Sequence, residues 1–289
     1  MKKLIPVLLI LTAVFIISCE KEYSSENNEG GSDLIVGVDC RISKIVYTDT
    51  NAVTGGGIGS IAADINNLDI VTKINKFDSL SNTIEFIGSP IYVNDTVYLN
   101  SDEYFVTDFN KRILRLHALT DPTDPFSVQY EIDYFYDGAG YLINKFFSFT
   151  AFPGVPFQIV RYTYSGGRLT HMRSNEQVGG VDGDLITDAE IDYYNNILPN
   201  RFLYIFPDEL TYFNYSQFFN FGVRPSNAPK DIKVRHYDPG NVLRDSTVTT
   251  FSNYIMSRDN YVLSVQMGGN DLISIPAPKA RLSFSYKCK

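Results

Sequence analysis

Acidic side chains gather in one short stretch of the chain, where they could bind a cation. Asp182, Asp184 and Asp188 belong to the run Asp-Gly-Asp-Leu-Ile-Thr-Asp-Ala-Glu at 182–190. Carboxylate oxygens in a glycine-containing turn suit Ca²⁺. The run does not match an EF-hand loop, because Tyr193 stands where that loop carries its bidentate Glu. Calcium bound by these three aspartates is a hypothesis, and a solvated hairpin turn that needs no cofactor is the alternative.

The chain has few of the side chains on which common enzyme motifs depend. It has three His and three Cys, and it contains no His-Glu-x-x-His, Cys-x-x-Cys, Gly-x-Ser-x-Gly or P-loop motif. His117, His171 and His236 stand in strand-like segments, where we expect surface or cross-strand positions. No residue is therefore assigned a catalytic role.

A dense aromatic cluster could bind a ligand. Nine of the 20 residues at 202–221 are Phe or Tyr. Exposed rings of Tyr204, Tyr212 and Tyr215 would form a platform for the apolar faces of sugars. The alternative, which we favour, is a hydrophobic core, since each aromatic side chain buries roughly 150–250 Å².

The amino terminus has the features of an export signal. Lys2 and Lys3 precede 14 uncharged residues at 4–17, fewer than the ~20 that a membrane-spanning helix needs. The pattern is typical of a secretory signal. The following Ile-Ile-Ser-Cys, which ends at Cys19, resembles a bacterial lipobox. That resemblance implies removal of the signal peptide at 1–18, acylation of Cys19 and a lipid anchor in a membrane.

The residues after Cys19 are typical of a flexible tether. The segment 19–33 is rich in Ser, Asn and Gly, carries five acidic residues and has no apolar period. Acidic residues directly after a lipidated Cys resemble the surface-export signals of some Gram-negative lipoproteins. We therefore expect an outer-membrane lipoprotein, with the cell surface favoured over the periplasmic face.

The two remaining cysteines bound one domain. Cys40 follows the tether and Cys288 lies one residue from the carboxyl terminus. Export would place both in an oxidising compartment, where a disulfide is expected. The bridge would join the first strand to the last and make 34–289 a single β-rich domain. Two free thiols are the alternative.

Most of the chain alternates between apolar and polar residues, as half-buried strands do. The segment 128–136 alternates, 137–140 is a glycine turn, and 141–150 returns as a strand. A similar hairpin surrounds Gly166 and Gly167, and weaker ones follow. Further strands are predicted at 41–48, 68–75, 83–88, 91–99, 103–108, 112–119 and 280–288. We predict an all-β fold, a curved antiparallel meander of hairpins, open or partly closed like a barrel.

Two segments depart from this alternation. Pro207, Asp208 and Glu209 suit the first turn of a helix that could run towards Phe221. We therefore allow at most one or two short helices. The glycine-rich segment 51–60 is predicted to be a mobile loop.

The hairpin at 134–142 carries a recognisable pattern, Tyr-x-Tyr-Asp-x-x-Gly-x-Leu. It resembles the YD repeats of RHS-type proteins. Together with the lipobox, it is similar to a group of Gram-negative lipoproteins built from such hairpins. The segment 221–232 resembles the Gly-x-x-Ser-x-Asn-x-Pro segment of that group, with Pro225 as an extra residue. The resemblance covers about 130–267 and implies a curved sheet of many strands, but it implies no activity.

The charge and composition of the chain restrict the classes of partner that it could bind. The net charge is −8 and the pI about 4.9, which argues against nucleic acid because phosphate binding needs a basic surface. The expected function is a membrane-anchored, non-catalytic module that binds a polysaccharide or an envelope protein. One alternative is an envelope hydrolase whose site is assembled from distant residues. Another is a structural component of a lipoprotein assembly.

Overall fold

The computed structural model describes residues 40–49, 57–68, 70–78, 83–120, 127–208, 215–269 and 279–288. The first strands are β1 (Cys40–Asp49), β2 (Gly57–Ile65), β3 (Val71–Asp78), β4 (Thr83–Gly88), β5 (Ile91–Val93), β6 (Thr96–Tyr98), β7 (Tyr104–Thr107), β8 (Ile113–Leu119) and β9 (Gln129–Tyr136). The others are β10 (Leu142–Phe149), β11 (Pro156–Ser165), β12 (Arg168–Val178), β13 (Val181–Tyr193), β14 (Pro229–Asp238), β15 (Val242–Met256), β16 (Val262–Gly269) and β17 (Lys279–Cys288). A 3₁₀ turn, η3 (Tyr215–Phe218), lies between β13 and β14. In the described part of the chain, no helix is long and apolar enough to span a membrane.

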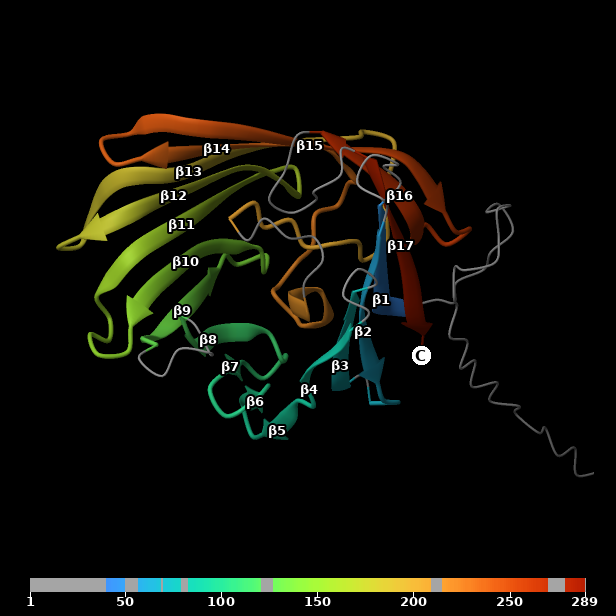
Figure 1. Ribbon diagram of the computed structural model, residues 1–289, viewed down its shortest axis with the longest axis horizontal. Coiled ribbons are helices and arrows are strands. Elements are labelled where there is room, and N and C mark those ends of the chain that lie inside the picture. The colour runs from blue at the N-terminus through green and yellow to red at the C-terminus, as the bar shows by residue number, and fades with distance from the viewer. Residues whose placement is uncertain are drawn as a thin grey trace, which may run out of the picture.

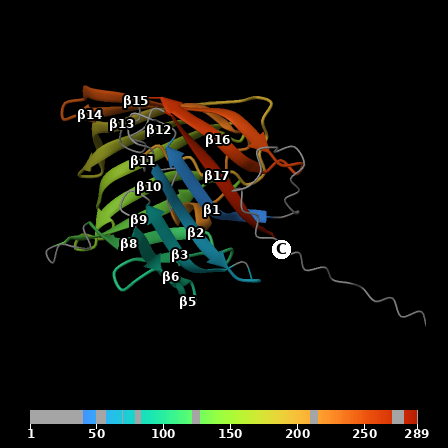
Figure 2. The ribbon, with the colours of Figure 1, turned by 45° about the vertical axis from the view of Figure 1, so that its right-hand side comes forward.

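The strands form one antiparallel meander that nearly closes into a barrel (Figures 1 and 2). β17 returns to pair with β1, from Cys40 opposite Cys288 to Asp49 opposite Ala280. The described residues form 17 strands, and an odd number of strands cannot alternate in direction all the way round a closed sheet. The two consecutive strands that run in the same direction are β4 and β5. β4 pairs with β3, and β5 pairs with β6. β4 and β5 are thus two halves of one strand, bent where Pro90 removes a backbone donor.

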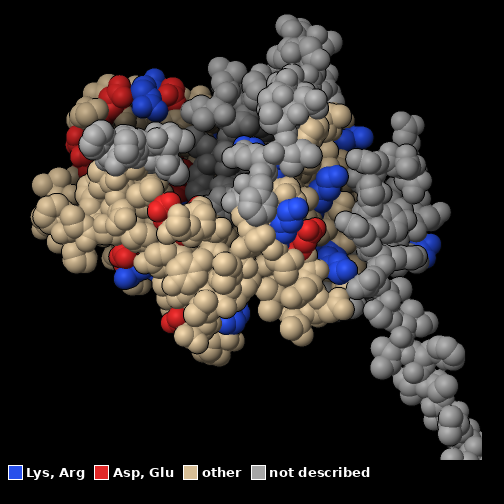
Figure 3. All heavy atoms as spheres, turned by 60° about the horizontal axis from the view of Figure 1, so that its bottom comes forward, with Lys and Arg blue, Asp and Glu red and all other residues tan. Residues whose placement is uncertain are grey.

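The strands bury apolar side chains inside the barrel, and many of their outward-facing side chains are polar. In β9, Ile132 and Tyr134 are buried. The alternate residue Asp133 lies opposite Arg115 of β8, 2.6 Å from its Nε. This pattern follows the two-residue period of a strand with one solvated face. Figure 3 shows Lys, Arg, Asp and Glu side chains on the outside of the barrel.

The interior is filled by the described part of the connection between β13 and β14, residues 194–208 and 215–228, which we call the plug. In Figure 1 it runs through the space that the strands enclose. Every residue from Phe202 to Phe206 is buried. Phe221 packs edge-on against the wall residue Tyr134, with ring centres 5.3 Å apart. The hydrophobic core therefore lies between the wall and the plug.

A buried ion pair also joins wall and plug. The side chain of Lys145 in β10 is 1% exposed, and its Nζ lies 3.1 Å from Oδ2 of the plug residue Asp208. The other carboxylate oxygen accepts a 2.6 Å hydrogen bond from the Tyr162 hydroxyl of β11. The Lys145 ammonium also lies 4.5 Å from the centre of the Phe206 ring. These contacts satisfy both buried charges.

The predicted disulfide is confirmed. Cys40 and Cys288 are bonded with sulfur atoms 2.06 Å apart, at the ends of the paired strands β1 and β17. The bridge closes the barrel where the chain enters and leaves it. The residues predicted to be signal peptide and tether lie outside the described residues.

The all-β prediction is confirmed, while several local predictions were wrong. Residues 57–60 belong to β2 rather than to a mobile loop, and 51–56 lie outside the described residues. The helix expected from Pro207 is replaced, in its described part, by η3. The acidic run 182–190 lies within β13, and its hairpin turn is at Gly179 and Gly180.

Candidate functional site

The plug caps one end of the barrel by hydrogen bonds to the turns there. The amide of Val223 donates to the carbonyl of Gly140 in the β9–β10 turn (2.9 Å). The amide of Ser226 donates to Gly167 in the β11–β12 turn (3.1 Å). Cys40, Cys288 and these turns share this end because the strands alternate in direction.

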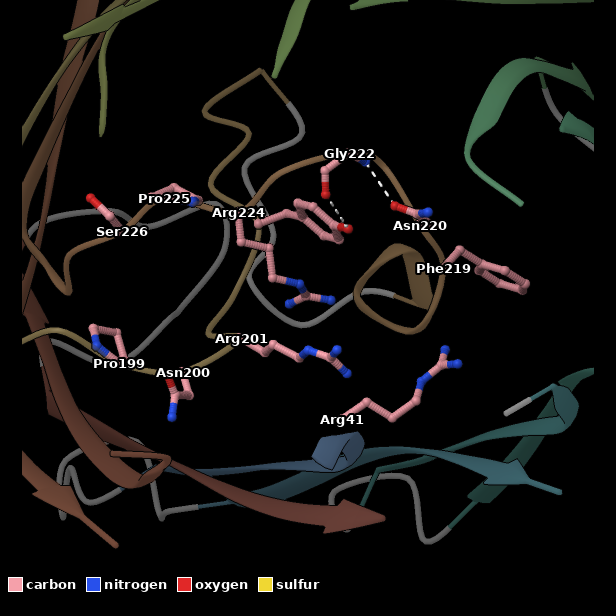
Figure 4. A pocket seen from close by; sticks show the side chains of 11 residues that line it. Arg41, Pro199, Asn200, Arg201, Phe219, Asn220, Gly222, Arg224, Pro225 and Ser226 are labelled. Carbon is pink, nitrogen blue, oxygen red and sulfur yellow. Dashed lines mark hydrogen bonds between the residues drawn. The ribbon is translucent and has the colours of Figure 1, made fainter. Parts of the chain in front are cut away.

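A cavity of about 510 Å³ lies where the plug meets β1. Three of its lining residues are arginines: Arg41 from β1, and Arg201 and Arg224 from the plug. Figure 4 shows the guanidinium groups of Arg201 and Arg224 near one another, while that of Arg41 is directed towards η3 and Phe219. The other lining residues are Pro199, Asn200, Tyr204, Phe219, Asn220, Gly222, Pro225 and Ser226. No described residue that lines the cavity is Asp or Glu.

Arg224 is held in place by neutral groups. Its guanidinium lies 3.9 Å from the centre of the Tyr204 ring. Its Nη2 donates to the main-chain oxygen of Gln217 (2.8 Å), and its Nη1 donates to that of Phe202. Burial lowers the pKa of the Arg224 guanidinium, and the positive charge of Arg41 lowers it further. Arginine nevertheless keeps its charge in proteins.

The other two arginines reach the cavity from different elements. Arg41 precedes the bulge in β1 between Ile42 and Lys44, and its Nη2 donates to the main-chain oxygen of Phe218. Arg201 is exposed and has a positive φ of 45°, unusual for a non-glycine residue. The arrangement can present several N–H donors and positive charge to one bound molecule.

A smaller cavity of about 160 Å³ lies beside the first and shares Arg41, Phe219 and Asn220 with it. Its other walls are mainly apolar and include Val97 and Ile113. The arginine-lined cavity thus has an apolar neighbour.

The predicted aromatic platform is wrong for Tyr204. Tyr204 is 5% exposed, and its ring lies between Arg224 and Phe206. Its hydroxyl donates to Gly222 (3.1 Å). Tyr204 is a core residue, as the favoured alternative held. Tyr212 and the side chain of Tyr215 lie outside the described residues.

Each of the three aspartates proposed as a calcium ligand forms hydrogen bonds or ion pairs with other residues of the chain. Asp182 accepts from Arg161 (2.7 Å) and from Gln177, and these hydrogen bonds hold the pKa of its carboxyl below the usual range. Asp184 accepts from the Gly240 amide (2.7 Å). The carboxylate of Asp188 lies between two basic side chains of the outer wall, His171 and Arg235, each 2.7 Å away. Among the residues that the structure describes, no cluster of three or more His, Cys, Asp or Glu could hold a metal.

The histidines lie apart, in three different strands. His117 stacks on Tyr104, with ring centres 4.7 Å apart. His171 faces Asp188 on the outer wall, and His236 of β14 lies 3.9 Å from Asp245 of β15. The three histidines occupy cross-strand positions, as expected.

Sequence reasoning missed the arginine cavity. Arg41 and Arg201 are 160 positions apart in the chain, and neither stands in a basic cluster. Only Arg224 falls in a segment that drew attention, through its resemblance. The signal that could have found the site is the long plug between two strands of a regular meander.

Comparisons with known proteins support the fold. Neither a scan against protein families nor a search of curated proteins gave a match. The chain is similar to a porin-like protein from Bacteroides uniformis, with a TM-score of 0.55, 11% identity, and coverage of 85% of this chain and 98% of that one. A porin-like protein from Bacteroides vulgatus matches with a TM-score of 0.48, 14% identity, and coverage of 86% and 99%.

A further match is to a TcdB2-TccC3-TEV structure, with a TM-score of 0.32 and 8% identity. It covers 77% of this chain but 10% of the other. The first match shows that this barrel architecture exists in a solved structure. At these identities the likeness concerns the fold alone, and the YD resemblance stays a prediction.

Proposed function

We propose that this protein is an exported lipoprotein, held at the outer membrane by lipid on Cys19, whose plugged barrel stands in water as a non-catalytic binding module. The signal-like segment, the lipobox-like Cys19 and the acidic tether support the anchor. The Cys40–Cys288 disulfide fits an oxidising compartment.

The outer wall of the barrel is the observation that carries the proposal. Side chains there form ion pairs across neighbouring strands. In β13 and β14, Arg235 bridges Asp188 (2.7 Å) and Glu190 (3.1 Å). In β8 and β9, Arg115 bridges Asp133 and Glu131. A membrane-spanning barrel instead turns an apolar band about 25 Å tall towards lipid.

The interior supports the same conclusion. Membrane barrels have polar interiors, which are water-filled in porins, whereas this barrel packs the aromatic plug residues Phe206 and Phe221 against its wall. The core thus resembles that of a water-soluble domain. The anchor, rather than insertion of the strands, would then hold the protein at the membrane.

The arginine-lined cavity is the proposed binding site. Its described lining contains no Asp, Glu, His, Lys or Cys, the side chains that most often act as general acids, bases or nucleophiles. The lining suits recognition better than bond cleavage. The partner is proposed to be a polysaccharide or an envelope component, with the cell surface as the favoured location.

Amine labelling tests whether the wall stands in water. Lys76 in β3 and Lys233 in β14 are exposed and lie within different parts of the wall. A water-soluble amine reagent applied to opened membranes should label both to the same extent as in detergent-solubilised protein. Buried Lys145 is the internal control and should stay unlabelled until denaturation. Protection of Lys76 or Lys233 in membranes would contradict the proposal.

A further inference from the structure

The arginine-lined cavity has the charge and donors of an anion site. Three guanidinium groups share one cavity in a chain whose net charge is −8. Positive charges that line a partly buried space attract anions, and low-dielectric walls strengthen the field that they create.

Arg224 gives the cavity a preorganised donor. The packing on Tyr204 and the hydrogen bonds to Phe202 and Gln217 fix the guanidinium plane. A guanidinium has five N–H groups, so those two carbonyls leave donors to spare. Apart from burial, the side chains that most perturb the pKa of Arg224 are Tyr204, Arg41 and Tyr286, none of which is a carboxylate. Its rigid fork matches the geometry of carboxylate and phosphate oxygens.

We propose that this cavity binds an oxyanion group, a carboxylate, sulfate or phosphate, carried on a small polar molecule such as an acidic sugar. The inference rests on the binding role proposed above and names the chemistry of its ligand. Arg224 is the central donor, while Arg41 and Arg201 approach the anion from the sides. The volume of about 510 Å³ admits a sugar-sized molecule.

Titration calorimetry on the mature, detergent-solubilised protein tests the proposal. The probes are sodium phosphate, sodium sulfate and sodium galacturonate at constant ionic strength, with neutral galactose as the control. At least one of the three anions should bind saturably at one site, and galactose should not bind. The anion that binds most tightly identifies the group. Saturable binding of none of the three would overturn the proposal.

Variants locate the binding to the cavity. Arg201→Gln and Arg224→Gln should each weaken the tightest anion about tenfold or more, the effect of losing a charge-assisted hydrogen bond. Arg244→Gln removes one charge from the outer wall, where Arg244 pairs with Asp245, and should bind like the wild type. Because Arg224 also supports the plug, Arg201→Gln decides the outcome if Arg224→Gln does not fold.

Unchanged binding in Arg201→Gln, or equal weakening in Arg244→Gln, would overturn the assignment to this cavity. The result of the anion-binding experiment is independent of the result of amine labelling. A protein with protected wall lysines could still bind the anion here, and a protein with labelled lysines could fail to bind it.

Discussion

Single side chains explain why the Tyr-x-Tyr-Asp-x-x-Gly-x-Leu hairpin folds as it does. Tyr134 and Leu142 point into the core and are 5% and 1% exposed. The Asp137 carboxylate accepts from the amides of Ala139 and Tyr141, at 3.0 and 2.9 Å, and so closes the turn. Gly140 adopts a positive φ of 89°, which glycine tolerates. The sequence predicts this hairpin well because all its determinants are local.

The three cavity arginines, by contrast, could not be predicted as a site from their local sequence. Nothing near Arg41 or Arg201 in the sequence marks them, because long-range strand pairing and the path of the plug bring them together. Tyr204 shows a related difficulty: its sequence neighbours do not tell whether it faces solvent or core. Burial, which decides that question, depends on the whole barrel.

At the residue scale, we expect the loss of one partner of the Lys145–Asp208 pair to destabilise the protein more than the apolar replacement of both. Lys145→Met leaves Asp208 as a buried charge and should lower the free energy of unfolding by about 3–5 kcal/mol. The double variant Lys145→Met/Asp208→Leu should be more stable than Lys145→Met alone. Urea denaturation measures both.

An exposed pair provides the control for that prediction. Asp133→Ala breaks the contact with Arg115, whose side chain is 43% exposed, and should cost about 1 kcal/mol or less. If Lys145→Met proved no more destabilising than Asp133→Ala, the buried pair would not hold the plug as described.

At the scale of elements, the turn between β5 and β6 and the glycine-rich start of β2 were the features that local sequence could not reveal. The alternation in 91–99 predicts one strand, whereas the chain turns at Asn94 and Asp95 between β5 and β6. The glycines of 57–60 favour a loop, yet pairing with β1 makes them part of β2. Neighbouring strands override weak local preferences in both places.

The plug should tolerate no side chain at Gly222, where it docks on the β9–β10 turn. Gly222 has a φ of +90°, and an added Cβ would lie 2.3 Å from the carbonyl oxygen of Gly140. Gly222→Ala should therefore destabilise the protein by at least about 3 kcal/mol, from strained backbone and overpacking together. Thermal denaturation with a denaturant series measures the change.

Gly240, in the β14–β15 turn, is the control position that distinguishes the cost of backbone strain from the cost of overpacking. Its φ is +80°, but nothing lies within 4 Å of an added Cβ. Gly240→Ala should cost only about 1 kcal/mol, the effect of the backbone conformation alone. Equal costs for Gly222→Ala and Gly240→Ala would mean that the plug does not press on the turn.

For the whole molecule, closure depends on both a covalent and a hydrogen-bonded seam. The Cys40–Cys288 bridge spans 248 positions, and β1 and β17 pair along their length beside it. Cys40 and Cys288, the two cysteines other than Cys19, made the seam predictable. The register of the strands and the near-closure of the barrel follow from contacts too distant for a sequence pattern to show.

The double variant Cys40→Ser/Cys288→Ser should fold but be less stable. The chain-entropy model gives at most about 5 kcal/mol for so long a loop, while the β1–β17 ladder keeps the native topology. Equilibrium unfolding of the variant beside the oxidised wild type measures the loss. An unchanged midpoint would show that the ladder alone closes the barrel.

The barrel fold and the ion pairs of the outer wall lead to one question about the whole molecule, which is whether the barrel lies in the membrane or beside it. The direct test replaces residues 1–19 with an export signal that ends in an Ala-x-Ala cleavage site and carries no lipid. We predict that the wild type stays with membranes until detergent is added. The exported variant should be recovered in the soluble fraction with Cys40 and Cys288 oxidised, which confirms its export. Retention of that oxidised variant in the membrane would contradict the central claim, because strands rather than lipid would then hold the protein there.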